Sequence, residues 1–237
     1  MSPPATYDLT VHADHAPALS PEATFVFADI AGFTALTEVH GDTQAADLAQ
    51  AFAADVRARL GDYRAELVKT IGDALMLRTP DPEAAVRLGV FLAYDLGRAH
   101  GAPQVRVGMH HGPAVHRDGD WFGATVNTAA RISGSAVGGE VLLSEAVHER
   151  AGDLANVRFA GRGPHALRNL SEPVVLFAAI PAADLAAPLE VDPVCRMAVQ
   201  PGRCAGALLH GSIEYHFCSL ACAARFAADP DAYVIRA

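Results

Sequence analysis

Long apolar runs are missing from this chain of 237 residues. No stretch of about 18 uninterrupted apolar residues occurs, so we expect neither a membrane-spanning helix nor a membrane partner. The opening residues, MSPPATYDLTVHADHAP, lack the basic and apolar parts of a secretion signal, which predicts a cytoplasmic protein. Basic residues are also few: 18 Lys and Arg stand against 27 Asp and Glu and form no cluster, so we expect no nucleic-acid partner.

Cysteine is absent from the first 194 residues, and all four cysteines follow at Cys195, Cys204, Cys218 and Cys222. Just before them, the alanine- and proline-rich stretch 181–190 lacks strand periodicity, which is typical of a linker. We therefore expect an N-terminal tail at 1–20, one domain at 21–180 and a small domain at 191–237. A domain this short usually needs a bound metal or disulfides to stabilise it. Disulfides are the less favoured interpretation, because cytosolic thiols stay reduced.

Three separated segments combine acids with a lysine, an amide and an arginine: FVFADIAGFT at 25–34, VKTIGDALML at 68–77 and GDWFGATVNTAARI at 119–132. Asp29 and Asp73 each adjoin an apolar run rich in strand formers, a pattern that suits divalent metal at the rim of a sheet. Asn127 and Arg131 lie four residues apart in a predicted helix, so both project from one face. Metal carboxylates together with an arginine indicate phosphate chemistry.

These segments resemble the catalytic domain of the class III adenylyl and guanylyl cyclases over roughly residues 21–180. The resemblance implies an α+β fold, a ferredoxin-like sandwich with a mainly antiparallel sheet. It implies that Asp29 and Asp73 bridge two Mg²⁺ or Mn²⁺ ions per active site, with the Ile30 carbonyl as a further ligand. One metal would activate the ribose 3′-hydroxyl and the other would hold the β- and γ-phosphates.

The resemblance assigns the remaining side chains to the nucleotide. It places Lys69 and Asp120 against the base, where a donor and an acceptor match adenine, while guanine presents the reverse pattern; the substrate is therefore expected to be ATP. Guanylyl members typically carry Glu and Cys at these two positions. Asn127 would orient the ribose, and Arg131 would stabilise the transferring phosphate with its fixed fork of donors. Arg168 falls where many relatives have a lysine that binds the terminal phosphates.

The resemblance also implies a head-to-tail homodimer, because the family places the metal aspartates and the base-binding residues of one centre on different subunits. Activity should then depend on protein concentration. The predicted reaction converts ATP to 3′,5′-cyclic AMP and pyrophosphate in intracellular signalling. The alternative is a catalytically silent scaffold whose role is metal or partner binding by residues 191–237, although silent relatives usually lose a metal aspartate or the arginine.

These candidate site residues also have purely structural interpretations. Asp29 could cap the helix that begins near Phe33, and Gly72-Asp73 could be only a hairpin turn. The loop alignment at Asp120 could slip onto Asp118. Among the histidines, His110 and His111 are adjacent on a predicted strand and point to opposite faces, so we interpret them as structural. No role is assigned to His12, His15 and His40.

The periodicity predicts, in chain order, a strand at 24–30, helices within 34–59, a hairpin at 62–78 turning at 69–73, a helix at 82–100, a strand at 104–115, a loop to Asp120, a helix at 124–135, shorter elements, and a last strand at 173–180. This order agrees with the α+β sandwich. The core is expected to be well buried, because 51% of the residues are hydrophobic.

The C-terminal segments VDPVCRMAV and EYHFCSLACAARFAADPDAY resemble a YHS domain and related treble-clef modules, with a Tyr215-His216 pair. Cys195, Cys218 and Cys222 fit the cysteine order of these modules and could bind Zn²⁺ or Cu⁺. Cys218 and Cys222, four residues apart, are expected on one face at a helix start, where the macrodipole favours thiolates. This module could regulate the cyclase through metal or redox state, or be a packed ββα unit without metal. The fourth ligand stays open among Cys204, Asp192 and His216.

Overall fold

A seven-stranded sheet forms the centre of the computed structural model, which describes residues 21–99, 101–182 and 190–234. Its strands are β1 Ala23–Ile30, β2 Glu66–Ile71, β3 Ala74–Thr79, β4 Val105–Gly112, β7 Val141–Ser144, β8 Val157–His165 and β9 Val174–Pro181. They follow the order β2-β3-β1-β4-β7-β9-β8, and every neighbouring pair is antiparallel except β4 and β7. The mainly antiparallel α+β sheet predicted from the sequence is confirmed.

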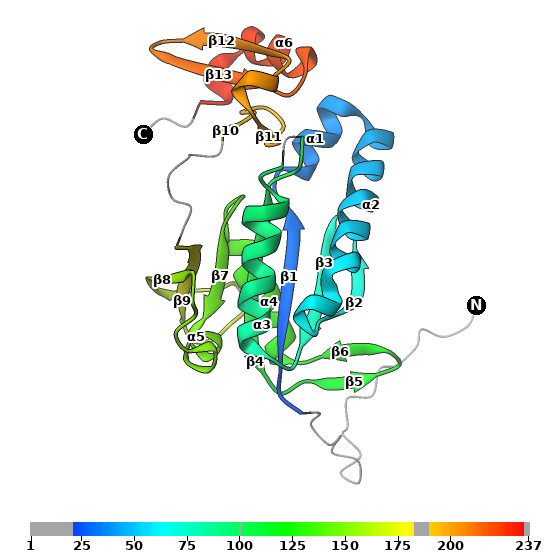
Figure 1. The fold of residues 1–237 in the computed structure, drawn as a ribbon, viewed down its shortest axis with the longest axis vertical. Helices are drawn as coiled ribbons and strands as arrows, with labels where there is room; N and C mark the ends of the chain where they lie inside the picture. Colours follow the sequence, from blue (N-terminus) through cyan, green and yellow to red (C-terminus); the bar gives the residue numbers. More distant parts are fainter. Residues whose placement is uncertain (1–20, 100, 183–189, 235–237) are drawn as a thin grey trace, which may run out of the picture.

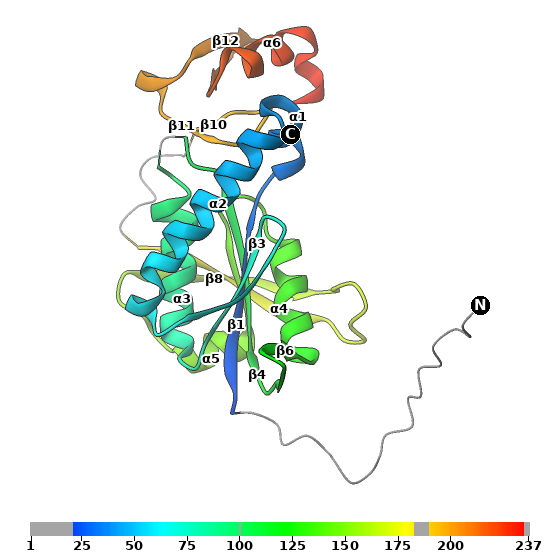
Figure 2. The same ribbon diagram turned by 90° about the vertical axis from the view of Figure 1, so that its right-hand side faces the viewer.

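Helices cover both faces of this sheet: α1 Phe33–His40, α2 Asp42–Arg59, α3 Pro82–Val90, α4 Ala124–Ser135 and α5 Glu145–Ala151. In Figure 2 the sheet lies between α2 and α3 on one side and α4 on the other. Side chains of β1 alternate accordingly, since Val26 and Ala28 pack in the core under α2 and α3, and Phe25 and Phe27 pack under α4. By this alternation Asp29 faces the α4 side.

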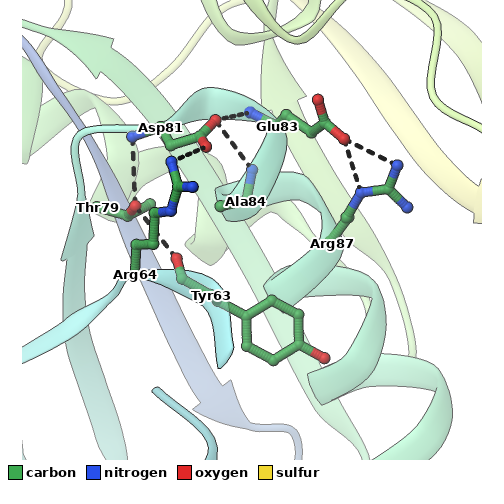
Figure 3. Close-up of polar contacts among 7 residues, drawn as sticks. All are labelled: Tyr63, Arg64, Thr79, Asp81, Glu83, Ala84 and Arg87. Carbon is green, nitrogen blue, oxygen red and sulfur yellow. Dashed lines mark hydrogen bonds and ion pairs between the residues drawn. The ribbon is translucent and has the colours of Figure 1, made fainter. Parts of the chain in front are cut away.

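The start of α3 shows how locally the sequence specifies its elements (Figure 3). The Asp81 carboxylate accepts hydrogen bonds from the backbone N–H groups of Glu83 (3.0 Å) and Ala84 (3.3 Å), and proline occupies the first turn. Arg64 lies 3.7 Å from the same carboxylate. The Thr79 hydroxyl donates to the Tyr63 carbonyl (3.4 Å) and accepts the backbone N–H of Asp81 (3.3 Å). These two bonds tie the end of β3 to the short 3₁₀ helix η1 Leu60–Tyr63.

Several expected boundaries move by a few residues. Gly41, with φ 83°, separates α1 from α2 inside the predicted helical stretch. The predicted helix 82–100 is α3 continued by a π-helical turn at Phe91–Leu96, and it ends at Gly97. The strand expected at 104–115 stops at Gly112, and a separate hairpin follows, made of β5 Val115–Arg117 and β6 Asp120–Phe122. Asp120 therefore lies in a short strand and not in a loop.

The C-terminal residues form a small separate unit, called the YHS module below. It contains β10 Glu190–Val191, β11 Ala198–Val199, η3 Pro201–Arg203, β12 Gly206–His210, β13 Ile213–Phe217, α6 Leu220–Ala228 and η4 Pro230–Ala232. Its core holds Val194, Phe217 and Phe226. Figures 1 and 2 show the module resting on the end of the first domain, next to α1. The predicted ββα core corresponds to β12, β13 and α6.

Among the residues described, no helix combines the length and the apolar character that crossing a membrane requires. His12, His15 and most of the predicted linker lie outside the described residues.

Candidate active site and cysteine cluster

The two predicted metal aspartates meet at one end of the sheet. Asp29 is the penultimate residue of β1, and Asp73 follows Gly72 in the tight turn between β2 and β3. Partial burial, the neighbouring charge of Asp29 and a hydrogen bond between the two side chains raise the pKa of Asp73 to about 6. Two carboxylates in contact need a shared proton or a cation between them, which makes this pair a fitting donor set for divalent metal.

Asp29 does not cap a helix. The N-cap of α1 is Gly32, with φ 76° and no side-chain cap. The Asp29 side chain instead accepts hydrogen bonds from Arg106, whose Nε lies 2.7 Å from Oδ2 and whose second guanidinium nitrogen contacts the same oxygen. The two residues face each other across β1 and β4. Sequence reasoning missed Arg106, because its contact with Asp29 depends on the register of two strands that are far apart in the chain.

The crowded carboxylates predict a pH-dependent cost to the metal-free fold. Because Asp73 has its pKa raised to about 6 in the folded chain, the folded state binds a proton more tightly than the unfolded state, and the free energy of unfolding falls as pH rises through about 4 to 6. Asp73→Asn removes the repulsion. We expect it to unfold at a higher temperature than the wild type at about pH 7.5 without metal, with the difference shrinking at about pH 5.

Thermal denaturation in chelator, with and without Mn²⁺, checks this expectation. Mn²⁺ should raise the unfolding temperature of the wild type and leave that of Asp73→Asn nearly unchanged, since the variant lacks one of the two carboxylates that would hold the ion. A variant that is less stable than the wild type at both pH values would contradict a destabilising carboxylate pair.

The predicted base-binding residues form an ion pair. Lys69 Nζ lies 2.5 Å from Asp120 Oδ2, and the Lys69 ammonium lies 5.9 Å from the centroid of the Phe122 ring. The hydrogen bond from Lys69, followed by one from the Trp121 backbone, lowers the pKa of Asp120. Lys69 is within β2, opposite Met76, and not at the edge of the turn as expected. A donor on β2 and an acceptor on β6 are thus held side by side.

Asp120, and not Asp118, is the carboxylate that pairs with Lys69. Asp118 occupies the tip of the β5–β6 hairpin in a left-handed conformation (φ 50°). Lys69 is also the only lysine of the chain. The slipped alignment considered from the sequence therefore does not agree with the geometry.

The other three predicted substrate residues are exposed. Asn127 and Arg131 share one face of α4. Arg168 lies in the loop after β8, whose neighbour Leu167 is buried against the α4 side of the sheet. β8 and β2 are the two outermost strands of the sheet, so Arg168 follows a strand at the opposite edge from the one that carries Lys69.

The two adjacent histidines behave as structural residues. His110 Nδ1 lies 2.7 Å from the Ser144 hydroxyl, and His111 Nδ1 lies 2.9 Å from the Thr24 hydroxyl, so they contact different neighbouring strands. Burial lowers the pKa of His110 to about 4, which keeps this imidazole neutral.

The three cysteines assigned to metal converge in the YHS module. The Cys218 sulfur lies 3.3 Å from that of Cys195 and 3.8 Å from that of Cys222. These distances exceed the disulfide length of about 2.05 Å. Cys222 lies in the first turn of α6, but Cys218 precedes the Ser219 N-cap, so the turn before the helix, and not helical periodicity, brings the two thiols together. Hydrogen bonds from the two neighbouring thiols lower the pKa of Cys222.

None of the three fourth-ligand candidates from the sequence belongs to the group of ligand atoms that the structure brings together. Asp192 is fully buried, and its oxygens accept backbone N–H groups at 2.8 to 3.4 Å. His216 Nδ1 lies 2.5 Å from Glu190 Oε2. The Cys204 thiol donates to the Pro201 carbonyl at 3.0 Å. All three side chains therefore have other partners.

His40, to which the sequence analysis gave no role, joins the cluster instead. Its Nε2 lies 3.6 Å from the Cys218 sulfur and 3.8 Å from the Cys222 sulfur. The ligand atoms of His40 and of the three converging cysteines all lie within 4.8 Å of one another. His40 ends α1 in the first domain, far from the cysteines in sequence. No local pattern could have signalled this contact.

Comparison with known families agrees with both domains. A model described as the adenylate and guanylate cyclase catalytic domain matches residues 17–177, and a YHS domain model matches residues 191–237. The chain therefore belongs to the adenylate and guanylate cyclase catalytic domain family and carries a YHS domain after it.

Among characterised relatives, a pH-sensitive adenylate cyclase of Mycobacterium tuberculosis is 37% identical over 162 residues, which cover 66% of this chain and 40% of the relative. An adenylate cyclase of Streptomyces coelicolor is 35% identical over 126 residues, covering 52% of this chain and 32% of the relative. The chain thus spans about 40% or less of the length of these two proteins.

Solved structures show the same fold. Adenylate cyclases of Trypanosoma brucei in their monomeric state align with a TM-score of 0.62 and 26% identity, over 71% of this chain and 92% of theirs. An adenylate/guanylate cyclase/hydrolase of Silicibacter pomeroyi aligns with a TM-score of 0.60 and 25% identity, over 68% of this chain and 98% of its own.

Proposed function

We propose that this protein is an adenylate cyclase that forms 3′,5′-cyclic AMP and pyrophosphate from ATP. The observation that carries the proposal is the pairing of Lys69 with Asp120, in a chain that also brings Asp29 and Asp73 together. Relatives named adenylate cyclase, 35–37% identical, support the same activity. A donor and an acceptor fixed side by side can satisfy adenine N1 and N6, whereas guanine would leave both groups mismatched.

The site residues would each perform a different part of the cyclisation reaction. Asp29 and Asp73, with the Ile30 carbonyl, would hold two Mg²⁺ or Mn²⁺ ions, which supply an activated 3′-hydroxyl and charge neutralisation at the phosphates. Arg106 donates to the Asp29 carboxylate and fixes its direction across the sheet. Arg131 would donate to the α-phosphate as negative charge builds there, and Asn127 would hold the ribose so that its 3′-oxygen lies in line with the α-phosphorus.

A second copy of the chain supplies the missing half of each centre in this proposal. Two observations support it. Asn127 and Arg131 are exposed, so their face of α4 is open to a partner. Beside Lys69, the apolar side chains of Ile71 and Phe122 are 49% and 51% exposed, as expected for a surface that another subunit covers. Each site would combine Asp29 and Asp73 of one subunit with the base and phosphate residues of the other.

Incubating the purified chain with ATP or with GTP and Mn²⁺, and quantifying cyclic nucleotide, tests the proposed activity. We expect cyclic AMP from ATP, far less product from GTP, and none from the Asp73→Ala variant. Absence of any cyclic product would favour the alternative, a cyclase-like scaffold that binds metal through the cysteine cluster.

A further inference from the structure

We propose that His40 of the first domain and Cys195, Cys218 and Cys222 of the YHS module together form one tetrahedral site for Zn²⁺ or a similar thiophilic divalent ion. The ion would be shared between the two domains. Three cysteines alone would make a site internal to the module, whereas the fourth ligand makes the ion a crosslink between the module and helix α1.

The distances fit a four-coordinate ion. Zinc bonds of about 2.3 Å to sulfur and about 2.0 Å to nitrogen give tetrahedral edges of about 3.8 Å between two sulfurs and about 3.6 Å between sulfur and nitrogen. The separation of Cys218 and Cys222 is 3.8 Å, and His40 Nε2 lies 3.6 and 3.8 Å from the same two sulfurs. The shortest pair, Cys195 and Cys218 at 3.3 Å, needs to open by only about half an ångström.

A buried carboxylate holds the ligand loops in place. One oxygen of Asp192 accepts the N–H groups of Val194 (2.9 Å) and Cys195 (3.4 Å), and the other accepts the N–H of Cys218 (2.8 Å). The Ser219 hydroxyl accepts the N–H of Cys222 at 3.1 Å. These bonds fix the backbone of all three cysteines before any ion binds, as outer-shell groups do in metal sites.

The contact between His40 and the cysteines belongs to a wider interface. The Arg225 guanidinium of α6 donates to the Glu38 carbonyl at 2.6 Å, and Val39 packs against the core of the module. Glu38 and Val39 form the last turn of α1 just before His40, so the histidine is held at the module by its neighbours. A cation at the C-terminal end of a helix is also favoured by the helix dipole.

The cluster is accessible to an incoming ion. A pocket of about 280 Å³ opens between the domains and is lined by Leu36, His40 and Gln44 on one side and by Met197 and Cys218 on the other. Polar and sulfur-bearing side chains at its wall give a path for the ion and for a chelator.

The shared ion would act close to the predicted catalytic metals. The module touches the start of α1 as well as its end, because the Arg196 side chain packs against Gly32, where an added Cβ would lie 2.7 Å from Arg196 Cγ. Gly32 follows Ile30 by two residues. An eight-residue helix depends on such packing for its order, so losing the ion should loosen α1 and weaken metal binding at Asp29. This consequence rests on the proposed cyclase function.

Metal binding to the full chain tests the site without nucleotide or activity. We expect one Zn²⁺ per chain by elemental analysis, and visible d–d bands of tetrahedral geometry after Co²⁺ substitution. His40→Ala should weaken Zn²⁺ binding by more than the roughly 10- to 100-fold typical for loss of an outer-shell partner, and should change the Co²⁺ bands. His40→Cys should restore tight tetrahedral binding, with an additional thiolate-to-cobalt charge-transfer contribution.

His210→Ala is the matched control, since His210 lies on β12 of the same module but outside the cluster; it should bind like the wild type. Wild-type affinity and an unchanged Co²⁺ spectrum in His40→Ala, or no Zn²⁺ bound by the wild type, would overturn the proposal. In a separate measurement, His40→Ala should raise the Mn²⁺ concentration needed for cyclic AMP formation. A variant that loses Zn²⁺ but keeps the wild-type Mn²⁺ requirement would contradict the coupling and leave the cyclase proposal intact.

Discussion

Equal amounts of the Asp73→Ala and Arg131→Ala chains, each inactive alone, should regain about a quarter of the wild-type cyclase activity when they are mixed. Random pairing makes about half of the dimers mixed, and a mixed two-fold dimer has one centre with both lesions and one with none. Removing a donor to the developing phosphate charge typically costs ~10²- to 10³-fold, so the recovered activity would stand far above either parent.

Matched controls show whether the recovered cyclase activity comes from subunits that contribute different halves of each centre. Asp29→Ala mixed with Asp73→Ala should stay inactive, because both lesions fall in the same half of the centre and every centre lacks a carboxylate. Cyclic AMP formation is measured after co-refolding or prolonged mixing, so that subunits exchange. If Asp73→Ala and Arg131→Ala never complement although the chains dimerise, each centre is built within a single chain and the proposed division is wrong.

Replacing the base-reading pair should reverse the choice of nucleotide. The double variant Lys69→Glu with Asp120→Cys removes the donor and the acceptor that match adenine and introduces the pair typical of guanylyl cyclases. Because a buried mismatch against the wrong base leaves polar groups unpaired, we expect the ratio of kcat/KM for ATP over GTP to fall by ~10³- to 10⁴-fold. Initial rates with both nucleotides, in Mn²⁺, measure this ratio.

Asp118→Ala serves as the control for this experiment, since Asp118 lies at the tip of the same hairpin and Lys69 pairs with Asp120. It should keep the wild-type preference. An unchanged preference in the double variant would mean that the base is recognised elsewhere. The single variants should each bind ATP less well, because each leaves one partner of a 2.5 Å ion pair without its counterpart.

The sequence predicted the fold well because its elements are locally specified. The apolar run of β1, the capping of α3 by Asp81 and the helix at 124–135 follow from periodicity and capping alone. Errors occurred where a boundary depended on a single residue. Gly97 ends a helix expected to reach residue 100, and the strand bearing Asp120 is too short to show alternation.

The contacts that the sequence could not predict join residues far apart in the chain. Asp29 meets Arg106 only through the pairing of β1 with β4, a register that one sequence does not reveal. His40 meets Cys218 only because the YHS module packs on α1. The expected fourth ligands are all near the cysteines in sequence, and one of them, Asp192, accepts backbone N–H groups instead. The Asp29–Arg106 and His40–Cys218 contacts both depend on tertiary packing and not on a local sequence pattern.

The specific activity of the purified chain, measured as cyclic AMP formed from ATP with Mn²⁺ over a wide series of protein concentrations, is the most direct test of a cyclase assembled from two copies. We predict that specific activity rises with concentration to a plateau as half-sites pair, and that Asp73→Ala forms no product at any concentration. No cyclic AMP from the wild-type chain across the whole series would contradict this function.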